Sequence, residues 1–597
     1  MSTYIAPLAD QLFLLNELLG LEEISALPGY EDATLDLVTA ILDEAGKFGS
    51  EVLAPLNKTG DQQGCSIENG VVCTPDGFKE AYAKFVATGW NSLGAPTEYG
   101  GQGLPSIVAT SVSEIWHGAN MAFGLCPLLN QGGIEAVATH GSDTLKSIFL
   151  PKMVSGEWSS TMNLTESQAG SDLSQISTKA VRDGEHYRII GQKIFISYGE
   201  HDMADNIIHL VLARLPNGPK GIKGLSLFLV PKFLLNDDGS LGKHNDLGCV
   251  SIEHKLGIKA SPTSLMSFGE NGGAIGYLIG EENQGISNMF TMMNNTRLSV
   301  GLQGIGVAEH AYQQALAYAK DRVQGRDTNS DASSPAPIIK HADVRRMLMA
   351  MKSQTEATRA TAYFMSACLD RARRHPDPNV RSEDKALADL LTPVVKAWST
   401  DTGIAVANLG IQIHGGMGYI EKTGAAQHLR DVRVSAIYEG TNGIQAADLV
   451  GRKVARENAE SINALILKIK SYLDQSIVDE ISPLGKIDKH LLNSIQSLSN
   501  TTAWILDTFP TKPQNVAAGA AQFTQMLGIT MGGWLMAMSA SKSIKLLKTE
   551  TENRTFLEAK IYTSQFFADQ YLSQVPMLET LVKTGGLSLE HISDEYF

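Results

Sequence analysis

Several features that mark specialised classes of protein are scarce or absent in this sequence. The chain has only five cysteines in 597 residues, and no two of them have Cys-x-x-Cys spacing. They are Cys65, Cys73, Cys126, Cys249 and Cys368. Such scattered cysteines suit a reducing compartment and argue against a metal site made of cysteines alone. We therefore predict a cytoplasmic protein.

Basic residues and long apolar runs are also scarce. Lysine and arginine number 49 against 64 aspartates and glutamates, which gives a net charge of −15. A nucleic-acid-binding surface normally has a basic face, so we expect no nucleic-acid partner. No stretch provides the roughly 18 apolar residues that a membrane-spanning helix needs. The N-terminus has no positive segment before an apolar core, so the sequence predicts neither a secretion signal nor a membrane span.

What the sequence does contain is a change of periodicity along the chain. Apolar residues recur with helical spacing from 35 to 48, and helical patterns continue to about 158. From about 159 to 280, short β-type runs alternate with turn formers, including two runs within 187–197. Long helical stretches return near 306–319, 341–373 and 383–410, and more follow beyond 452.

The chain is too long for one hydrophobic core, so the pattern predicts several domains of mixed α+β class. We expect an N-terminal helical domain, a central β domain of the barrel or sandwich type, a C-terminal four-helix bundle and an appended helical domain. The predicted bounds are 1–34 for leader helices, 35–158 for the N-terminal domain, 159–282 for the β domain, 283–452 for the bundle and 453–597 for the appended domain.

The most distinctive local pattern is a carboxylate followed by glycine and threonine, Glu439-Gly440-Thr441. Because glycine has no Cβ, the backbone there can approach a ligand closely. A glycine-rich turn at 412–418 lies upstream. The two features fit a general base next to a cofactor cradle. They also fit a helix cap beside a loop.

Other motifs allow two interpretations as well. Residues 162–173 offer hydroxyl and backbone N–H groups for a polar heterocycle or a phosphate-bearing chain, or they form a capped turn. Phe195 fits a β core or a stacking partner for a cofactor ring. The run 301–306 follows no buried strand, so it is not predicted to bind a dinucleotide. A lone histidine such as His414 is more often structural, and no metal-ligand spacing surrounds it, so we predict no metal.

Taken in order, these motifs resemble the acyl-CoA dehydrogenase family. The similarity extends from about residue 35 to 452. Its matching segments are 96–101, 165–172, 191–197, 296–297, 321–326, 412–418 and 438–441. The length, with a leader and a C-terminal helical domain, resembles the long bacterial subgroup. That subgroup includes fatty-acyl-CoA dehydrogenases and 3-(methylthio)propionyl-CoA dehydrogenases.

The resemblance implies FAD held between the β domain and the bundle, an acyl-CoA substrate and Glu439 as the base. It assigns FAD binding to Met162, Leu164, Thr165, Gly170, Ser171, Phe195, Ile196, Ser197, Arg322, Gln412, Ile413, His414, Gly415, Gly416 and Thr441. It assigns substrate binding to Ser171, Asn294, Asn295, Thr296, Arg297 and Gly440. It also implies an electron-transfer flavoprotein as electron acceptor. Because FAD in this family touches two subunits, the resemblance implies a homo-oligomer and not a monomer, with a dimer favoured and a tetramer possible.

The implied chemistry is oxidation of an acyl-CoA to a trans-2-enoyl-CoA, as in fatty-acid β-oxidation. The base removes the α proton while the β hydride passes to the flavin, and preorganised donors stabilise the developing enolate. A carboxylate becomes a better base when an apolar pocket raises its pKa.

The chain departs from the family at two positions. Phe195 replaces the usual tryptophan, and Ser197 replaces the usual threonine, which keeps an aromatic wall and a hydroxyl group. Some members carry the base on the helix that includes Arg297, but residues 294–297 contain no acid, so the base is assigned to Glu439. Three alternatives remain open: a 3-(methylthio)propionyl-CoA dehydrogenase, an acyl-CoA oxidase and a non-catalytic DNA-protecting relative, the last disfavoured by the acidic charge.

Overall fold

The structure is a computed structural model that describes residues 4–327, 335–478, 484–549 and 552–597. Small parts of the predicted leader, bundle and appended domain therefore lie outside the described residues. The chain forms two compact units. The helical unit comprises Met1–Gly46, Pro105–Glu114 and Val300–Phe597, and the sheet unit comprises Lys47–Leu104 and Ile115–Ser299.

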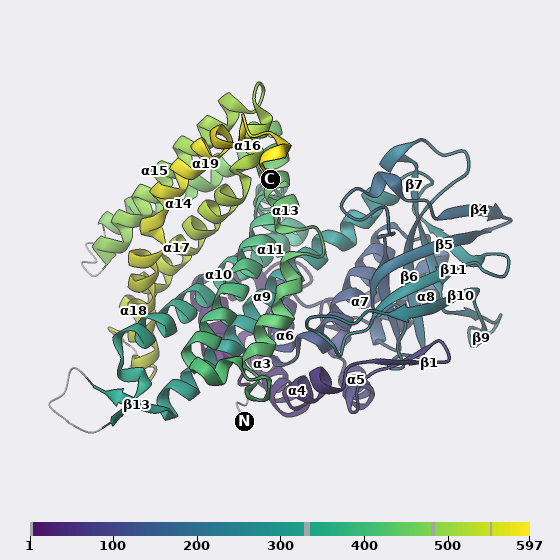
Figure 1. The fold of residues 1–597 in the computed structure, drawn as a ribbon, viewed down its shortest axis with the longest axis horizontal. Coiled ribbons are helices and arrows are strands. Elements are labelled where there is room, and N and C mark those ends of the chain that lie inside the picture. Colours follow the sequence, from purple (N-terminus) through teal and green to yellow (C-terminus); the bar gives the residue numbers. More distant parts are fainter. Residues whose placement is uncertain (1–3, 328–334, 479–483, 550–551) are drawn as a thin grey trace. The chain divides into compact units, whose positions relative to one another are not determined.

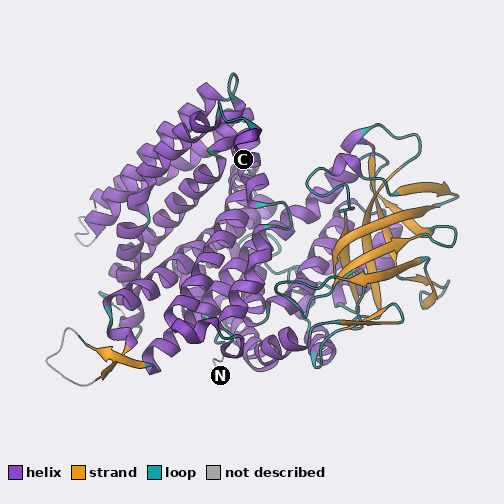
Figure 2. Ribbon diagram, viewed as in Figure 1, coloured by secondary structure: helices purple, strands orange, loops and turns teal. Residues whose placement is uncertain are grey.

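An eight-stranded sheet is the main β structure of the sheet unit, and helices of that unit lie beside it (Figures 1 and 2). Its strands are β3 (Trp158–Asn163), β4 (Lys179–Asp183), β5 (His186–Ser197), β6 (Asn206–Arg214), β7 (Leu225–Pro231), β10 (Leu247–Ile252), β11 (Thr263–Phe268) and β12 (Ala274–Ile279). The path is β10-β11-β5-β12-β7-β6-β3, and β4 pairs with β5 and β6. Most pairs are antiparallel, but β6 runs parallel to β3 and to β4.

Helices pack beside this sheet within the same unit. The helices α7 (Met121–His140) and α8 (Asp143–Ser155) contact β3, and every residue of β3 is buried. The helices α4 (Ala54–Gln63) and α5 (Phe78–Ala87) and the hairpin of β1 (Ser66–Glu68) and β2 (Val71–Cys73) precede them in the chain. A second hairpin joins β8 (Phe233–Leu235) and β9 (Leu241–His244).

The two short runs expected within 187–197 form one strand of 12 residues, β5. Its first half pairs with β4 and β12, and its second half pairs with β11. The change of partner occurs at Gly191, where a Cβ would lie 2.5 Å from Thr178 Oγ1. Glycine therefore permits a close approach that lets the second half of β5 join a different neighbour.

Long helices build the helical unit. Its first part contains α9 (Gly285–Asp321, continuing from the sheet unit), α10 (Ala342–Arg374), α11 (Pro378–His414), α12 (Ala425–Val432) and α13 (Asn442–Asp448). Helices were expected near 306–319, 341–373 and 383–410, and all three are present: α10 matches its predicted length, whereas α9 and α11 are longer than predicted. The helix α6 (Ser106–Ala119) and the hairpin of β13 (Val323–Arg326) and β14 (Pro335–Pro337) complete this part.

The C-terminal helices are α14 (Glu460–Val478), α15 (Gly485–Thr508), α16 (Pro513–Ala518), α17 (Ala520–Leu546), α18 (Arg554–Gln570) and α19 (Val575–Leu589). Of these helices, α17 and α18 pack against α10, and α14 and α17 pack against α11 (Figure 1). A Cβ at Gly528 or Gly532 would lie 2.6 Å from the Trp398 indole, so these glycines let α17 approach α11 closely. Across the described ranges, no helix combines the length and the apolar character that crossing a membrane requires.

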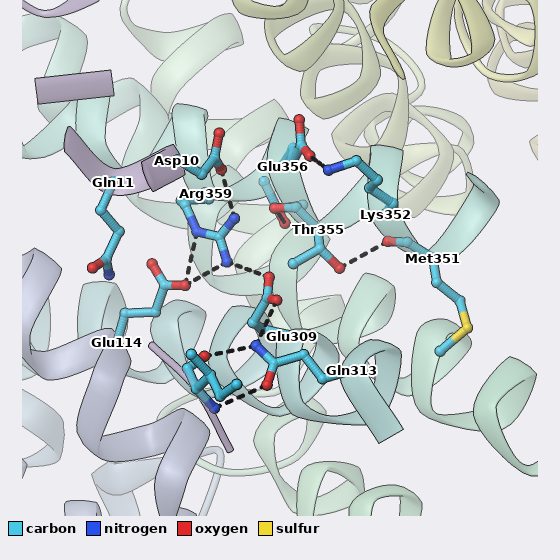
Figure 3. A network of polar contacts seen from close by, with 12 residues as sticks. Asp10, Gln11, Glu114, Glu309, Gln313, Met351, Lys352, Thr355, Glu356 and Arg359 are labelled. Carbon is cyan, nitrogen blue, oxygen red and sulfur yellow. Dashed lines mark hydrogen bonds and ion pairs between the residues drawn. The ribbon is translucent and has the colours of Figure 1, made fainter. Parts of the chain in front are cut away.

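A buried guanidinium connects three helices of the helical unit (Figure 3). Arg359 on α10 donates to Asp10 at 2.7 Å, to Glu114 at 2.8 Å and to Glu309 at 2.7 Å. Asp10 lies on the leader helix α1 (Leu8–Leu12), Glu114 on α6 and Glu309 on α9. Segments far apart in the sequence are therefore joined through one cation that is almost fully buried.

The same network reaches the C-terminal helices through Lys560 on α18. Its ammonium lies 2.6 Å from Asp10 and 2.7 Å from Glu356, and all three side chains are buried. Burial disfavours the ionised carboxyl, but Lys560 and Arg359 outweigh it and hold the pKa of Asp10 far below its usual range. The network therefore stays charged at neutral pH and fixes the leader to α10 and α18.

Candidate functional site

In the sheet unit, a loop between β3 and β4 is organised by one carboxylate, Glu166. Its oxygens accept hydrogen bonds from the backbone N–H groups of Ser177 at 2.8 Å and Thr178 at 3.0 Å and from the hydroxyl group of each of these residues. They also accept one from Lys193 Nζ at 2.8 Å. Lys193 also donates to the Leu164 carbonyl at 2.9 Å. Both ends of residues 164–178 are thus tied to β5.

The Glu166–Lys193 pair is charged at neutral pH. Burial opposes ionisation of Glu166, but Lys193 and the surrounding donors outweigh it and lower its pKa to about 2. Burial lowers the pKa of Lys193 to about 8, although Glu166 attracts the proton. The lowered pKa of Glu166 favours the charged pair, whereas the lowered pKa of Lys193 favours the neutral pair. The charged pair prevails because the Glu166 carboxylate receives several hydrogen bonds. Sequence reasoning missed this pair, whose only signal is a lysine in an apolar strand.

Two of the predicted cofactor segments meet in this unit. Ile194 N donates to Thr165 O at 2.9 Å, and Thr161 Oγ1 donates to Ser197 O at 2.7 Å, so 162–171 lies against 195–197. The predicted residues differ in exposure. Met162 and Ile196 are buried, Leu164, Thr165 and Ser197 are half-buried, and Gly170 and Ser171 are exposed. The Ile196 side chain belongs to the hydrophobic core of the sheet.

Phe195 does not belong to that core, so the β-core interpretation of this residue is wrong. Its side chain is 60% exposed, and its backbone φ is +58°. A left-handed conformation costs a non-glycine residue about 1–2 kcal/mol and is enriched at functional sites. The Phe195 ring is thus exposed on β5, and the residue before it, Ile194, donates its N–H to Thr165 of the 164–178 loop. This arrangement fits a stacking partner for a flat cofactor ring.

The predicted substrate residues 294–297 lie in the third and fourth turns of α9, in the part of that helix that belongs to the sheet unit. Asn294 is exposed, Asn295 is half-buried, and Thr296 and Arg297 are buried. Arg297 Nη1 donates to Asn294 Oδ1 at 3.1 Å. The Thr296 hydroxyl donates to the Met292 carbonyl of its own helix at 2.9 Å. Arg297 and Asn294 thus form one polar group, whereas Thr296 is engaged within the helix.

In the helical unit, the predicted base lies on a strained turn before α13. Glu439 has φ of +56° and Gly440 has φ of +84°. The positive φ of Gly440 favours glycine at this position, and a Cβ there would lie 2.7 Å from the Nε2 atom of the Gln445 side chain. Thr441 caps α13 by accepting from Ile444 N at 3.2 Å. The helix-cap interpretation is therefore correct for Thr441, while Glu439 stands on the turn itself.

The glycine-rich turn follows the end of α11. Ile413 and His414 are buried, and Gln412, Gly415 and Gly416 are exposed. His414 Nδ1 lies 2.7 Å from the Gly410 carbonyl, and its ring stacks on Tyr318 at 4.4 Å. Burial lowers the pKa of His414, so the imidazole is neutral at pH 7 and the structural interpretation of this residue is supported. Arg322, just after α9, is exposed.

Each unit offers features that fit part of a large, flat cofactor with a polar tail. In the sheet unit, Phe195 offers an exposed ring and Ser171 is exposed. In the helical unit, Gly415 and Gly416 have nothing within 4 Å of where a Cβ would stand. Open space over paired glycines suits a chain bearing phosphates. Among the side chains that the structure describes, no three of His, Cys, Asp or Glu are grouped as a metal site.

We predict that Glu166→Gln weakens the sheet unit in a pH-dependent way. A carboxylate with a depressed pKa stabilises the fold above its ordinary pKa near 4.5, and that contribution is lost as pH falls towards about 2. The variant should be less stable by about 1–3 kcal/mol at neutral pH. The difference should shrink as the pH is lowered, in urea unfolding measured at several pH values. A constant difference across this range would contradict the role given to the ionised Glu166.

Comparisons with known proteins cover almost the whole chain. The sequence models described as acyl-CoA dehydrogenase N-terminal, middle and C-terminal domain match residues 38–157, 161–270 and 283–454. A model described as acetyl-CoA dehydrogenase C-terminal like matches residues 464–592.

Full-length relatives and a solved structure agree with these matches. A 3-methylmercaptopropionyl-CoA dehydrogenase of Ruegeria pomeroyi is 44% identical, covering 98% of this chain and 99% of its own. A butyryl-CoA dehydrogenase of Syntrophomonas wolfei is 34% identical, covering 100% of this chain and 99% of its own. An acyl-CoA dehydrogenase from Bacillus anthracis, solved in complex with FAD, has a TM-score of 0.74 at 19% identity, covering 98% of this chain and 92% of its own.

Proposed function

Because the chain belongs to the acyl-CoA dehydrogenase family, we propose that it oxidises a short acyl-CoA thioester to the trans-2-enoyl-CoA. It is a FAD-dependent oxidoreductase. The observation that carries the proposal is Glu439, a carboxylate on a left-handed turn that is followed by a glycine with φ of +84°. Strain of this kind is maintained where a side chain must be held in one orientation.

In this proposal Glu439 removes the α proton of the thioester. The backbone N–H of Glu439 donates to the thioester oxygen as negative charge develops there, which lowers the barrier to proton removal. The acyl chain excludes water, and the loss of solvation raises the carboxyl pKa towards the working pH. Bound FAD supplies the acceptor for the β hydride.

The remaining predicted residues receive roles by the same proposal. Phe195 stacks against the flavin, and Ser171 contacts both cofactor and substrate. The turn at Gly415 and Gly416 holds the phosphate-bearing part of FAD, and Arg297 meets the CoA moiety. Support comes from the exposed Phe195 ring, the exposed 170–171 backbone and the open space over the paired glycines.

We propose 3-(methylthio)propionyl-CoA as the first substrate to test. The relative with 44% identity over its whole length is named for this substrate, and the relative with 34% identity is named for butyryl-CoA. Both acyl groups are short, unbranched and nearly equal in length. A short-chain pocket is therefore the simplest expectation, and fatty-acid β-oxidation of short esters is the alternative.

Further features belong to the same proposal. Electrons pass to an electron-transfer flavoprotein, the enzyme works in the cytoplasm, and it forms a homodimer. We propose that the expected four-helix bundle consists of α9, α10, α11 and a fourth helix formed by α13 and the following segment Leu449–Arg456, and the support is that both of these segments contact α11. Size determination in solution and reduction of a purified electron-transfer flavoprotein test these features.

The substrate proposal is tested with the purified flavoprotein and CoA esters of varied length, branching and sulfur content. An artificial electron acceptor reports turnover. We expect kcat/KM to be highest for 3-(methylthio)propionyl-CoA and about 10-fold or more lower for long-chain esters, because pocket size discriminates by steps of this order. A preference for long chains would contradict the short-chain pocket. Hydrogen peroxide formed in equal amount with enoyl-CoA would show an oxidase.

A further inference from the structure

A fully buried ammonium group, that of Lys396, lies next to the Glu439 turn. Lys396 occupies the middle of α11, between the buried residues Val395 and Ala397, and has no exposed surface. Burying an ammonium group is unfavourable unless its protons are hydrogen-bonded. The partners of Lys396 therefore indicate why a cation stands in this apolar part of the helix.

Two of those partners, Gly440 and Asn442, lie within three residues after Glu439 in the sequence. Lys396 Nζ donates to the Gly440 carbonyl at 2.7 Å and to Asn442 Oδ1 at 2.8 Å. The Asn442 amide donates in turn to Asp401 Oδ1 at 2.7 Å and to the Ala397 carbonyl at 3.2 Å. The residues after Glu439 are thus fastened to α11 at several points.

The residue before Glu439 is fastened as well. The Tyr438 hydroxyl donates to Gln303 Oε1 on α9. Glu439 therefore stands between two anchored neighbours, with Tyr438 held by α9 and Gly440 held by α11. A turn with two successive left-handed residues is unfavourable when one of them is not glycine, so external contacts must maintain it.

We propose that Lys396 is a positioning residue that holds the Glu439-Gly440 turn in its left-handed conformation through the Gly440 carbonyl and Asn442. This inference rests on the proposed function, in which Glu439 is the base. The ammonium group is suited to the task because it donates to two acceptors at once and needs no counter-charge on the turn. Charged donors also make stronger hydrogen bonds than neutral ones.

Lys396→Met tests the proposal because it keeps the apolar stem and removes the donors. We expect kcat per bound flavin to fall about 100-fold, since small misplacement of a reacting group has effects of this size. The exchange of the substrate α proton with D2O should slow in parallel, while KM changes little. A purely structural role would lower the amount of folded flavoprotein and leave both rates per flavin unchanged, and that result would overturn the proposal.

Two further variants complete the experiment. Lys385→Met removes an exposed lysine of the same helix and should retain wild-type rates. Asn442→Ala removes one of the two acceptors and should lower kcat per flavin about 10-fold. If Lys396→Met does not fold, kcat per flavin and α-proton exchange of Asn442→Ala test the proposal in its place. An active Lys396→Met beside an inactive Glu439→Gln removes only the role of Lys396. An active Glu439→Gln removes the proposed function.

Discussion

Replacing Glu439 by glutamine is expected to lower kcat by about 10²- to 10⁴-fold, the range over which a positioned general base contributes to catalysis. Glutamine keeps the shape of the side chain and the backbone N–H but cannot accept the α proton. Binding of FAD and of the CoA ester should therefore persist. The measurement is enoyl-CoA formation per bound flavin, together with exchange of the substrate α proton with D2O.

A matched control separates loss of the base from loss of a negative charge. Glu383→Gln changes an exposed glutamate in the first turns of α11 and should leave kcat unaltered. Since both variants replace a carboxylate by an amide, a difference in kcat between them shows the effect of losing the carboxylate at position 439. Near-normal turnover or unchanged α-proton exchange in Glu439→Gln would show that another group is the base.

Replacing Lys560 by methionine is expected to destabilise the helical unit by about 3–5 kcal/mol, because breaking a buried ion pair leaves an uncompensated charge inside the protein. Asp10 and Glu356 would each lose a partner within 2.7 Å. The loss should appear as a lower midpoint of urea unfolding followed by circular dichroism. The leader and α18 should become susceptible to proteolysis first, because Lys560 connects them directly.

A more exposed ion pair that also joins a C-terminal helix to the leader serves as a control. Lys542 on α17 lies 3.0 Å from Glu17 of the leader, and its side chain is 40% exposed. Lys542→Met should cost at most about 1 kcal/mol, since exposed ion pairs contribute little. Equal losses in the two lysine variants would show that burial is not what makes the Lys560 contacts important.

A double variant tests the origin of the effect. Asp10→Asn in the Lys560→Met background removes one of the carboxylates that Lys560 neutralised. The combined loss should be smaller than the sum of the single losses, with a coupling of about 0.5–3 kcal/mol, because the residues touch. Additive losses would contradict the idea that the uncompensated charge causes the instability. Asp10 keeps its contact with Arg359 in the single variant, so the coupling is expected to be partial.

Local periodicity predicted the order of elements along the chain well. The helical spacing from 35 onwards corresponds to α3 (Leu35–Phe48), and the three long helical stretches correspond to α9, α10 and α11. Such patterns are set by which side of an element is buried, and that information is present in each segment alone. The alternation within 187–197 correctly predicted β structure but divided one strand into two.

The sequence alone also determined the chemistry that the chain offers: a carboxylate followed by glycine, a hydroxyl-rich loop, a paired-glycine turn and no metal-ligand spacing. Only the tertiary structure decided how these groups are held. It turned Phe195 outward on a strained backbone, paired Glu166 with Lys193, and placed Lys396 beneath Gly440. These outcomes depend on contacts between residues far apart in the chain, and burial, strain and hydrogen-bond partners arise only when such residues meet.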